Sequence, residues 1–161
     1  MTALPVHHAP GACIHELRFT AMNADDIDAV LALEQRNFAF PWTRGNFIDS
    51  LRAGYSTWLM REDEHMLGYA VMMLVLDEAH LLNISILPER QRTGLGSMLL
   101  QHLFEEARGQ GVARIYLEVR QSNHSGCGFY LHHGFARIGE RADYYPARNG
   151  REAALVLEKN L

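Results

Sequence analysis

The chain has 161 residues, a length that usually forms one domain. Hydrophobic residues make up 48% of it, enough to bury a sizeable core, and the formal net charge is −4. This acidic balance argues against a general nucleic-acid binder, which usually presents a basic stripe, and it fits a basic peptide or protein substrate better.

No apolar run approaches the ~20 residues that span a bilayer, so we expect no membrane partner. Met1 to Cys13 lacks the basic and apolar regions of a signal peptide, and we expect residues 1–13 to form a flexible extension. The two cysteines, Cys13 and Cys127, indicate a reduced, cytoplasmic chain rather than a disulfide framework. We expect residues 14–161 to form a single domain that is a monomer or a weak oligomer.

The first half of the chain predicts a strand, two helices and two further strands. Asn23 stands before an acidic first turn, as at a helix start, and Thr43 is placed to cap a second, short helix. A polar turn at 62–64 separates the two later strands. The expected elements are a strand over 14–20, helices over 23–36 and 43–51, and strands over 54–61 and 66–76.

The second half predicts three strands around two helices, followed by a last strand. Apolar periodicity at Leu95, Leu99 and Leu103 indicates a helix directly after an apolar strand. A strand, helix and strand in succession imply one parallel pair in an otherwise mostly antiparallel sheet. The expected elements are strands over 81–87, 114–119, 135–141 and 152–157, helices over 94–109 and 123–133, and a loop over 143–150.

The turn between the strand at 81–87 and the following helix has the features of an anion site. Gly94 and Gly96 fall in the first helical turn, where backbone N–H groups have no intrahelical partner and the helix dipole is positive. The absent Cβ atoms let a ligand approach the backbone, and Arg90 and Arg92 add positive charge. The turn therefore predicts binding of a phosphate or pyrophosphate.

Two familiar phosphate loops do not fit this turn. No lysine follows Gly96, as a P-loop requires, and Leu99 stands where the dinucleotide fingerprint has its third glycine. The remaining pattern, Gln91-Arg92-Thr93-Gly94-Leu95-Gly96, resembles the acetyl-CoA pyrophosphate loop of the GCN5-related N-acetyltransferases (GNAT). The alternative is a helix start whose glycines serve only tight packing.

Acetyl transfer to an amine needs a proton acceptor for the amine and a proton donor for the departing thiolate. Glu118 ends a predicted strand and is a candidate base, although the residues alone favour a surface carboxylate paired with Arg114 or Arg120. The phenol of Tyr130 is a candidate acid, with a satisfied core tyrosine as the alternative. We expect Cys127 to be a buried packing residue. The histidines show no metal-ligand spacing, so we expect no metal.

Most of the chain, from 17 to 157, resembles the RimI-type GNAT subfamily, bacterial enzymes that acetylate the N-terminal alanine of protein eighteen of the small ribosomal subunit. Besides the glycine turn and Tyr130, the stretches that carry the resemblance are Glu34-Gln35-Arg36, Ala39-Phe40-Pro41-Trp42, Val75-Leu76-Asp77-Glu78-Ala79, Asn83-Ile84, Leu117-Glu118-Val119-Arg120, Ser122-Asn123, Gly134-Phe135, Tyr144-Tyr145-Pro146 and Gly150-Arg151-Glu152.

The resemblance implies a GNAT fold, a mixed α/β (α+β) architecture whose parallel strand pair is splayed and flanked by about four helices. It implies acetyl-CoA as co-substrate, a ribosomal protein N-terminus as partner, and no direct contact with nucleic acid. Glu118 is then the proton acceptor and Tyr130 the proton donor. The cofactor-binding residues that it implies are Ile84, Ser85, Ile86, Arg92, Thr93, Gly94, Leu95, Gly96, Ser97 and Asn123.

Three aromatic residues in predicted loops complete the expected site. We hypothesise that Trp42, Tyr144 and Tyr145 shape the channel for the incoming peptide; the alternative for Trp42 is that it holds its loop onto the sheet. The sequence departs from the subfamily at Gly126 and Gly128, which weaken the helix before Tyr130. Two other functions stay open: an acetyltransferase of wider range, and a module that binds acetyl-CoA without turnover.

Overall fold

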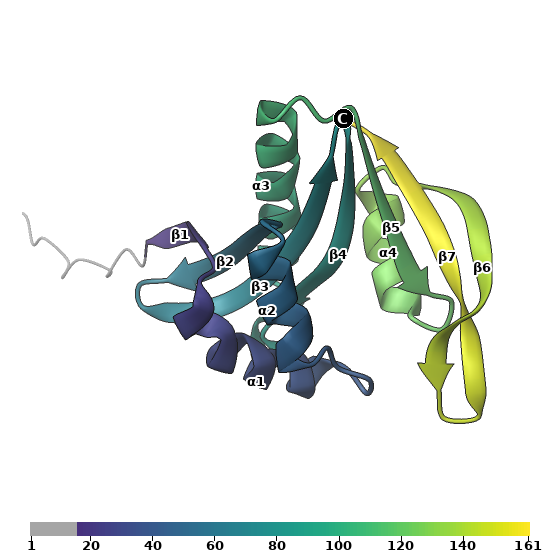
Figure 1. Cartoon of the computed structure of the whole chain (residues 1–161), viewed down its shortest axis with the longest axis horizontal. Coiled ribbons are helices and arrows are strands. Elements are labelled where there is room, and N and C mark those ends of the chain that lie inside the picture. Colours follow the sequence, from purple (N-terminus) through teal and green to yellow (C-terminus); the bar gives the residue numbers. More distant parts are fainter. Residues whose placement is uncertain (1–15) are drawn as a thin grey trace, which may run out of the picture.

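The computed structural model describes residues 16–161, and its strands form one seven-stranded sheet in the order β1-β2-β3-β4-β5-β7-β6 (Figure 1). Only β4 and β5 run parallel, so the expected mixed, mostly antiparallel sheet is confirmed. The extension expected at 1–13 lies outside the described residues. The strands are β1 (Leu17–Ala21), β2 (Ser56–Glu62), β3 (His65–Val75), β4 (Glu78–Ile86), β5 (Arg114–Arg120), β6 (Ala136–Ala147) and β7 (Gly150–Asn160).

Four α-helices connect these strands, and local capping explains where they begin. Asn23 caps the short 3₁₀ turn η1 that leads into the first helix, and Thr43 forms a reciprocal capping box with Asn46 at the second. Both predicted helix starts are confirmed. The helices are α1 (Ile27–Asn37), α2 (Arg44–Arg52), α3 (Leu95–Gly109) and α4 (His124–His132), with 3₁₀ turns η1 (Ala24–Asp26) and η2 (Pro88–Arg90).

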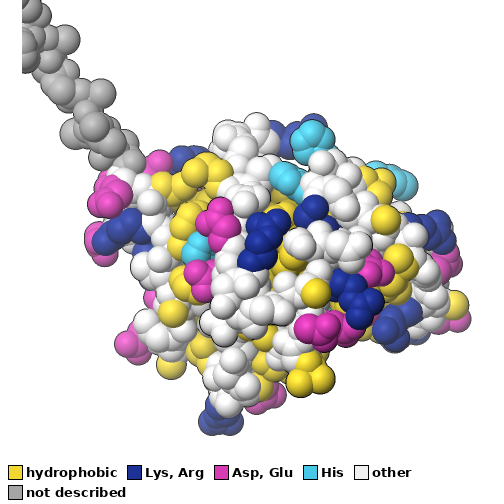
Figure 2. All heavy atoms as spheres, turned by 90° about the horizontal axis from the view of Figure 1, so that it is seen from above, with side chains coloured by type: hydrophobic (Ala, Val, Ile, Leu, Met, Phe, Trp, Pro, Cys, Tyr) yellow, Lys and Arg dark blue, Asp and Glu magenta, His cyan; other side chains and the backbone are white. Residues whose placement is uncertain are grey.

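The sheet separates two hydrophobic cores. Helices α1 and α2 cover one face, where Phe47 and Tyr69 are fully buried. Helix α3 packs on the other face through Leu99 and Leu103, and α4 adds the rings of Phe129 and Tyr130 to that core (Figure 1). None of the helices in residues 16–161 is long and apolar enough to cross a membrane. Seen from above, basic and acidic side chains are interspersed (Figure 2).

The parallel strands β4 and β5 pair over only part of their length. Their pairing runs from Glu78 and Arg114 to Leu81 and Leu117 and then stops. At the same level β4 carries one extra residue, Leu82, opposite β3. Such a bulge bends its strand and increases the local twist. The carboxyl-terminal halves of the two strands therefore diverge, as Figure 1 shows, and each presents an edge that the other does not cover.

The prediction of a loop over 143–150 is wrong, because most of these residues continue the last two strands. Strand β6 extends to Ala147 and β7 begins at Gly150, which leaves a two-residue turn. The pairing shifts register between Arg141 and Tyr145, so β6 bulges there, with Asp143 in a left-handed conformation (φ 50°). Pro146 is tolerated because β6 lies at the edge of the sheet.

Candidate active site

The glycine turn after β4 presents unpaired backbone donors. The first intrahelical bond of α3 joins the N–H of Met98 to the carbonyl of Gly94 (3.1 Å), so the preceding N–H groups of the helix have no intrahelical acceptor. Arg92 and Gly94 adopt left-handed conformations, with φ of 62° and 88°. A Cβ atom on Gly94 would meet no atom within 4 Å. The turn is therefore open on the side from which an anion would approach.

The positive charge of the turn comes from one arginine rather than two. Arg90 makes a two-pronged ion pair with Glu62 (2.9 and 3.0 Å), so its charge is already balanced. Arg92 is exposed and has no ion pair among the described residues. The hydroxyl of Thr93 donates to the carbonyl of Arg90 (2.5 Å), which fixes the turn. Arg92 is thus the side chain best placed to meet a phosphate.

The start of α3 also contacts α4. Ser97 Oγ lies 2.9 Å from His133 Nε2, just beyond the end of α4. A Cβ on Gly96 would lie 3.5 Å from the ring of Phe129, so this glycine allows the two helices to approach. Leu95 is buried in the core. The two glycines of the turn therefore differ: Gly94 faces open space, whereas Gly96 allows α3 to pack closely against α4.

The diverging half of β4 offers backbone groups to a ligand. The N–H of Leu87 donates to β3 at Leu67 (2.8 Å), and the carbonyl of Ser85 also lies against β3, at Gly68. Because successive residues of a strand alternate in direction, the backbone groups of Ile84 and Ile86 point toward the uncovered edge. The structure brings Ile84 and Ile86 to that edge, whereas the backbone of Ser85 faces β3.

Two amide side chains that sequence reasoning missed are bonded to the same edge. Asn37 Nδ2 donates to the buried Ser85 hydroxyl (2.5 Å) and to the carbonyl of Ile86 (2.8 Å), and Gln91 Nε2 donates to that carbonyl as well (3.1 Å). The position of Gln91 in the glycine pattern was the available signal; Asn37 had none. What remains for a ligand is the N–H and C=O of Ile84 and the N–H of Ile86.

Glu118 lies on β5, just past the point where β4 and β5 separate. Its side chain is only 15% exposed and pairs with Arg141 of β6, with Nε 3.3 Å from Oε1. Arg114 and Arg120, the partners considered from the sequence, pair instead with Glu78 and Glu152, each at 2.9 Å. The carboxylate is thus sheltered from bulk water and held by a cation from a different strand.

The phenol of Tyr130 reaches the same region from α4. Its ring packs edge-on against Phe135 and Phe129, and burial, with Tyr145 nearby, raises the pKa of the phenol well above its ordinary value of 10.0. We find no hydrogen bond to its hydroxyl among residues 16–161. The phenol of Tyr130 is therefore protonated at neutral pH. Asn123, which caps α4 by accepting from the N–H of Gly126 (2.9 Å), ends the loop that follows β5.

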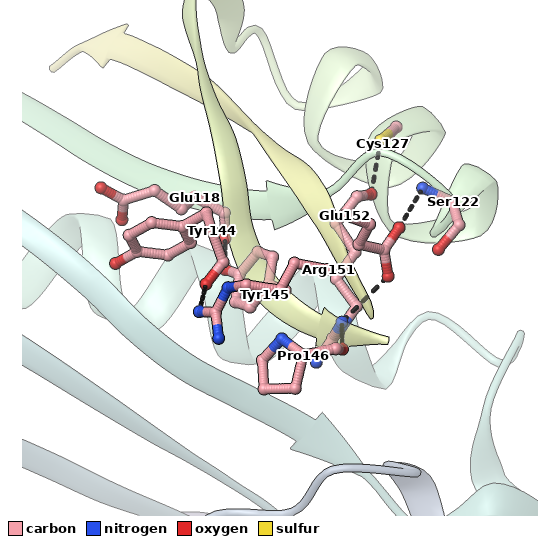
Figure 3. A network of polar contacts seen from close by, with 9 residues as sticks. Glu118, Ser122, Cys127, Tyr144, Tyr145, Pro146, Arg151 and Glu152 are labelled. Atoms are coloured by element: carbon pink, nitrogen blue, oxygen red, sulfur yellow. Dashed lines mark hydrogen bonds and ion pairs between the residues drawn. The ribbon is translucent and has the colours of Figure 1, made fainter. Parts of the chain in front are cut away.

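The bulge in β6 brings two tyrosines to Glu118. The hydroxyl of Tyr145 donates to the backbone carbonyl of Glu118 (3.1 Å). Burial and the neighbouring Tyr144 and Glu118 raise the pKa of Tyr145 to about 12. Tyr144 is 42% exposed, and its ring faces the guanidinium of Arg141 at 5.7 Å. Figure 3 shows the side chains of Glu118 and Tyr144 pointing to the same side.

The side chain of Trp42 lies in the core under α2 rather than with Glu118, Tyr144 and Tyr145. Its ring packs 5.3 Å from Phe47 in the core beneath α2, and its backbone N–H donates to the buried Glu34 (2.7 Å). From the same loop, the ring of Phe40 approaches β5, with its centroid 5.2 Å from the guanidinium carbon of Arg120. In residues 16–161 no group of three or more His, Cys, Asp or Glu side chains is arranged to hold a metal.

Comparison with known proteins identifies relatives along most of the chain. The sequence model of the acetyltransferase (GNAT) family matches residues 27–135. The [ribosomal protein bS18]-alanine N-acetyltransferase of Escherichia coli K12 is 38% identical over 138 residues, which cover 86% of this chain and 93% of that protein. Its counterpart in Haemophilus influenzae is 36% identical over 137 residues, covering 84% and 93%.

Solved structures agree with these sequence relatives. The crystal structure of the E. coli ribosomal-protein-S18-alanine N-acetyltransferase superposes with a TM-score of 0.84 at 36% identity, over 90% of this chain and 94% of that one. Arabidopsis thaliana Naa50, in complex with the bisubstrate analogue CoA-Ac-MVNAL, superposes with a TM-score of 0.78 at 21% identity, over 90% and 99%. The second likeness, at that low identity, concerns the fold alone.

Proposed function

We propose, since this chain belongs to the acetyltransferase (GNAT) family, that it transfers the acetyl group of acetyl-CoA to the N-terminal α-amino group of ribosomal protein bS18, in the cytoplasm. The E. coli and H. influenzae relatives, at 38% and 36% identity, are [ribosomal protein bS18]-alanine N-acetyltransferases, which supports this substrate. The observation that carries the proposal is the divergence of β4 and β5, with the open glycine turn after one strand and Glu118 on the other.

The cofactor half of the site fits an acyl-CoA. Backbone N–H groups at the start of α3 and the side chain of Arg92 suit the charge of a pyrophosphate. The edge groups of Ile84 and Ile86 suit the amides of a pantetheine arm, which would bond to them as an added strand does. Acetyl-CoA, when bound, supplies an activated thioester. The amide of Asn123 lies at the end of the loop that continues β5 and is our further candidate for cofactor contact.

Glu118 and Tyr130 divide the proton transfers between them. The carboxylate of Glu118 accepts a proton from the incoming amine, directly or through a water molecule, and the phenol of Tyr130 donates one to the departing sulfur. An α-amino group has a pKa of about 7.7–8.0 against about 10.4 for lysine, so a carboxylate base suits the former better near neutral pH. Tyr144 and Tyr145 border the carboxylate and are our candidates for contact with the acceptor peptide.

The test is acetylation of matched peptides, followed by mass spectrometry. One peptide begins with a free alanine, as in the proposed substrate, and its twin has a blocked N-terminus and an internal lysine. We expect acetyl transfer to the first peptide alone. Transfer to the lysine would indicate a wider acceptor range, and binding of coenzyme A without transfer to either peptide would indicate a binding module.

A further inference from the structure

Arg120, the last residue of β5, contacts two segments that are distant from it in the sequence, and one of them also contacts Glu118. Its guanidinium carbon lies 5.2 Å from the ring centroid of Phe40, in the loop between α1 and α2, and 4.4 Å from that of Tyr145, on β6. Arg120 Nη1 also donates to the carbonyl of Pro146 (2.6 Å). One side chain therefore joins the α1–α2 loop to the β6–β7 hairpin.

The position of Arg120 is itself held by a carboxylate network. Nη1 donates to Glu152 Oε1 (2.9 Å), and the other oxygen of Glu152 accepts the backbone N–H of Ser122 (3.2 Å), as Figure 3 shows in part. These hydrogen bonds lower the pKa of Glu152, so it stays ionised and balances the arginine. Only 24% of the Arg120 side chain is exposed. Its position is thus determined from three directions.

The contact with Tyr145 connects Arg120 to the candidate base, Glu118. The ring that lies against Arg120 carries the hydroxyl that donates to the carbonyl of Glu118. The contact with Phe40 reaches the α1–α2 loop, where Phe40 is 43% exposed and the guanidinium of Arg120 lies over its ring. Removal of the guanidinium would take one contact from each ring and open a space beside them, while the Tyr145 hydroxyl would keep its bond to the carbonyl of Glu118.

We propose that Arg120 is a positioning residue that sets the gap between Phe40 and Tyr145, and through it the position and the size of the acceptor's first residue. This inference rests on the proposed function. An acceptor with a small first side chain fits a narrow gap, and a wider gap admits a larger one. Arg120 does not touch the reacting atoms, and its charge is already paired, so its loss acts on the acceptor rather than on the cofactor.

The test compares Arg120→Gln with Arg114→Gln. Arg114 is a matched control: it lies on the same strand and face, pairs with Glu78 (2.9 Å) and lies 5.9 Å from the ring of Tyr116, but at the opposite end of β5. For Arg120→Gln we expect the KM of an alanine-initiated peptide to rise roughly 10- to 100-fold, because small misplacements of a substrate have effects of this size. The KM of acetyl-CoA should stay within about twofold.

Selectivity gives a second readout that a loss of stability would not produce. The ratio of kcat/KM for an alanine-initiated over a leucine-initiated peptide should fall several-fold in Arg120→Gln and stay unchanged in Arg114→Gln. Arg120→Lys should restore little, because an ammonium does not stack on rings as a planar guanidinium does. If Arg120→Gln does not fold, Phe40→Leu tests the same gap from an exposed position and should lower the same ratio.

Three outcomes separate the inference from the function on which it rests. An active wild type with unchanged peptide KM and selectivity in Arg120→Gln would overturn the positioning role alone. Equal increases in the KM of both substrates would also overturn it, since they indicate general damage. A wild type that transfers acetyl groups to none of the peptides would overturn the proposed function and the inference together.

Discussion

The cofactor side and the acceptor side of the site are built from the chain in different ways. The anion turn, the edge of β4 and the start of α3 are consecutive, from Ile84 to Ser97. The acceptor side instead combines Phe40, Glu118 and Tyr145, from three segments that are distant in sequence. A contiguous site depends on local conformation, whereas an assembled site depends on how the elements pack. Mutations on the two sides should therefore differ in which substrate they affect.

The largest effect is expected from Glu118→Gln, which keeps the shape of the side chain and removes the base. Near pH 7 we expect kcat/KM for the peptide to fall ~10²–10⁴-fold, the usual contribution of general acid–base catalysis, with unchanged affinity for acetyl-CoA. Because the α-amino group loses its own proton above about pH 8, the deficit should shrink as the pH rises. A rate–pH profile of both proteins measures this, and a deficit that is constant from pH 6.5 to 9 would contradict the assignment.

Tyr130→Phe should have a smaller effect with a different pH dependence. Removal of the proton donor should lower kcat by about 10²-fold, at the lower end of the range for general acid catalysis. Since burial raises the pKa of Tyr130 above 10.0, the wild-type phenol stays protonated as the pH rises, and the deficit should stay constant between pH 7 and 9.5. Tyr116→Phe, on the far part of β5, is the control and should leave kcat unchanged. Equal kcat in Tyr130→Phe and wild type would exclude Tyr130 as the donor.

On the cofactor side, Gly94→Val should weaken acetyl-CoA binding. The left-handed conformation of Gly94 is costly for a residue with a Cβ by about 1–2 kcal/mol, so the turn should rearrange and the Kd should rise by roughly tenfold. Gly54→Val is the matched control, because Gly54 has φ of 73° and also faces open space, but lies after α2. Calorimetric titration with acetyl-CoA should separate the two variants, and equal Kd values would show that the turn does not bind the cofactor.

The smallest effects are expected at two glycines of α4, Gly126 and Gly128. A Cβ on Gly126 would lie 2.5 Å from the amide nitrogen of Asn123, so Gly126→Ala should disturb the cap and lower the melting temperature. A Cβ on Gly128 would meet nothing within 4 Å, and Gly128→Ala should stabilise the helix by about 0.5–1 kcal/mol, or a few °C. Thermal unfolding of both variants checks this, and equal shifts would be inconsistent with the capping geometry.

The order of the elements, the helix starts at Asn23 and Thr43, and the tight turn at Gly94 could be predicted from the sequence alone. These features follow from short-range rules: apolar periodicity, side-chain caps and a backbone conformation that glycine tolerates. The family resemblance added the choice of Glu118 and Tyr130, which no spacing of residues requires. The prediction of a loop over 143–150 was wrong because pairing with β7 overrides the turn tendency of Asp143 and Pro146.

How the two sides meet depends on contacts between elements that are distant in the sequence. The bulge at Leu82 ends the pairing of β4 with β5, and a second bulge in β6 directs Tyr145 toward Glu118. The pairing of Arg141 with Glu118, and of Arg120 with Phe40 and Tyr145, likewise joins side chains from different elements. Such contacts depend on strand register and on packing across the sheet, and neither is set by the residues on each side of a position in the chain.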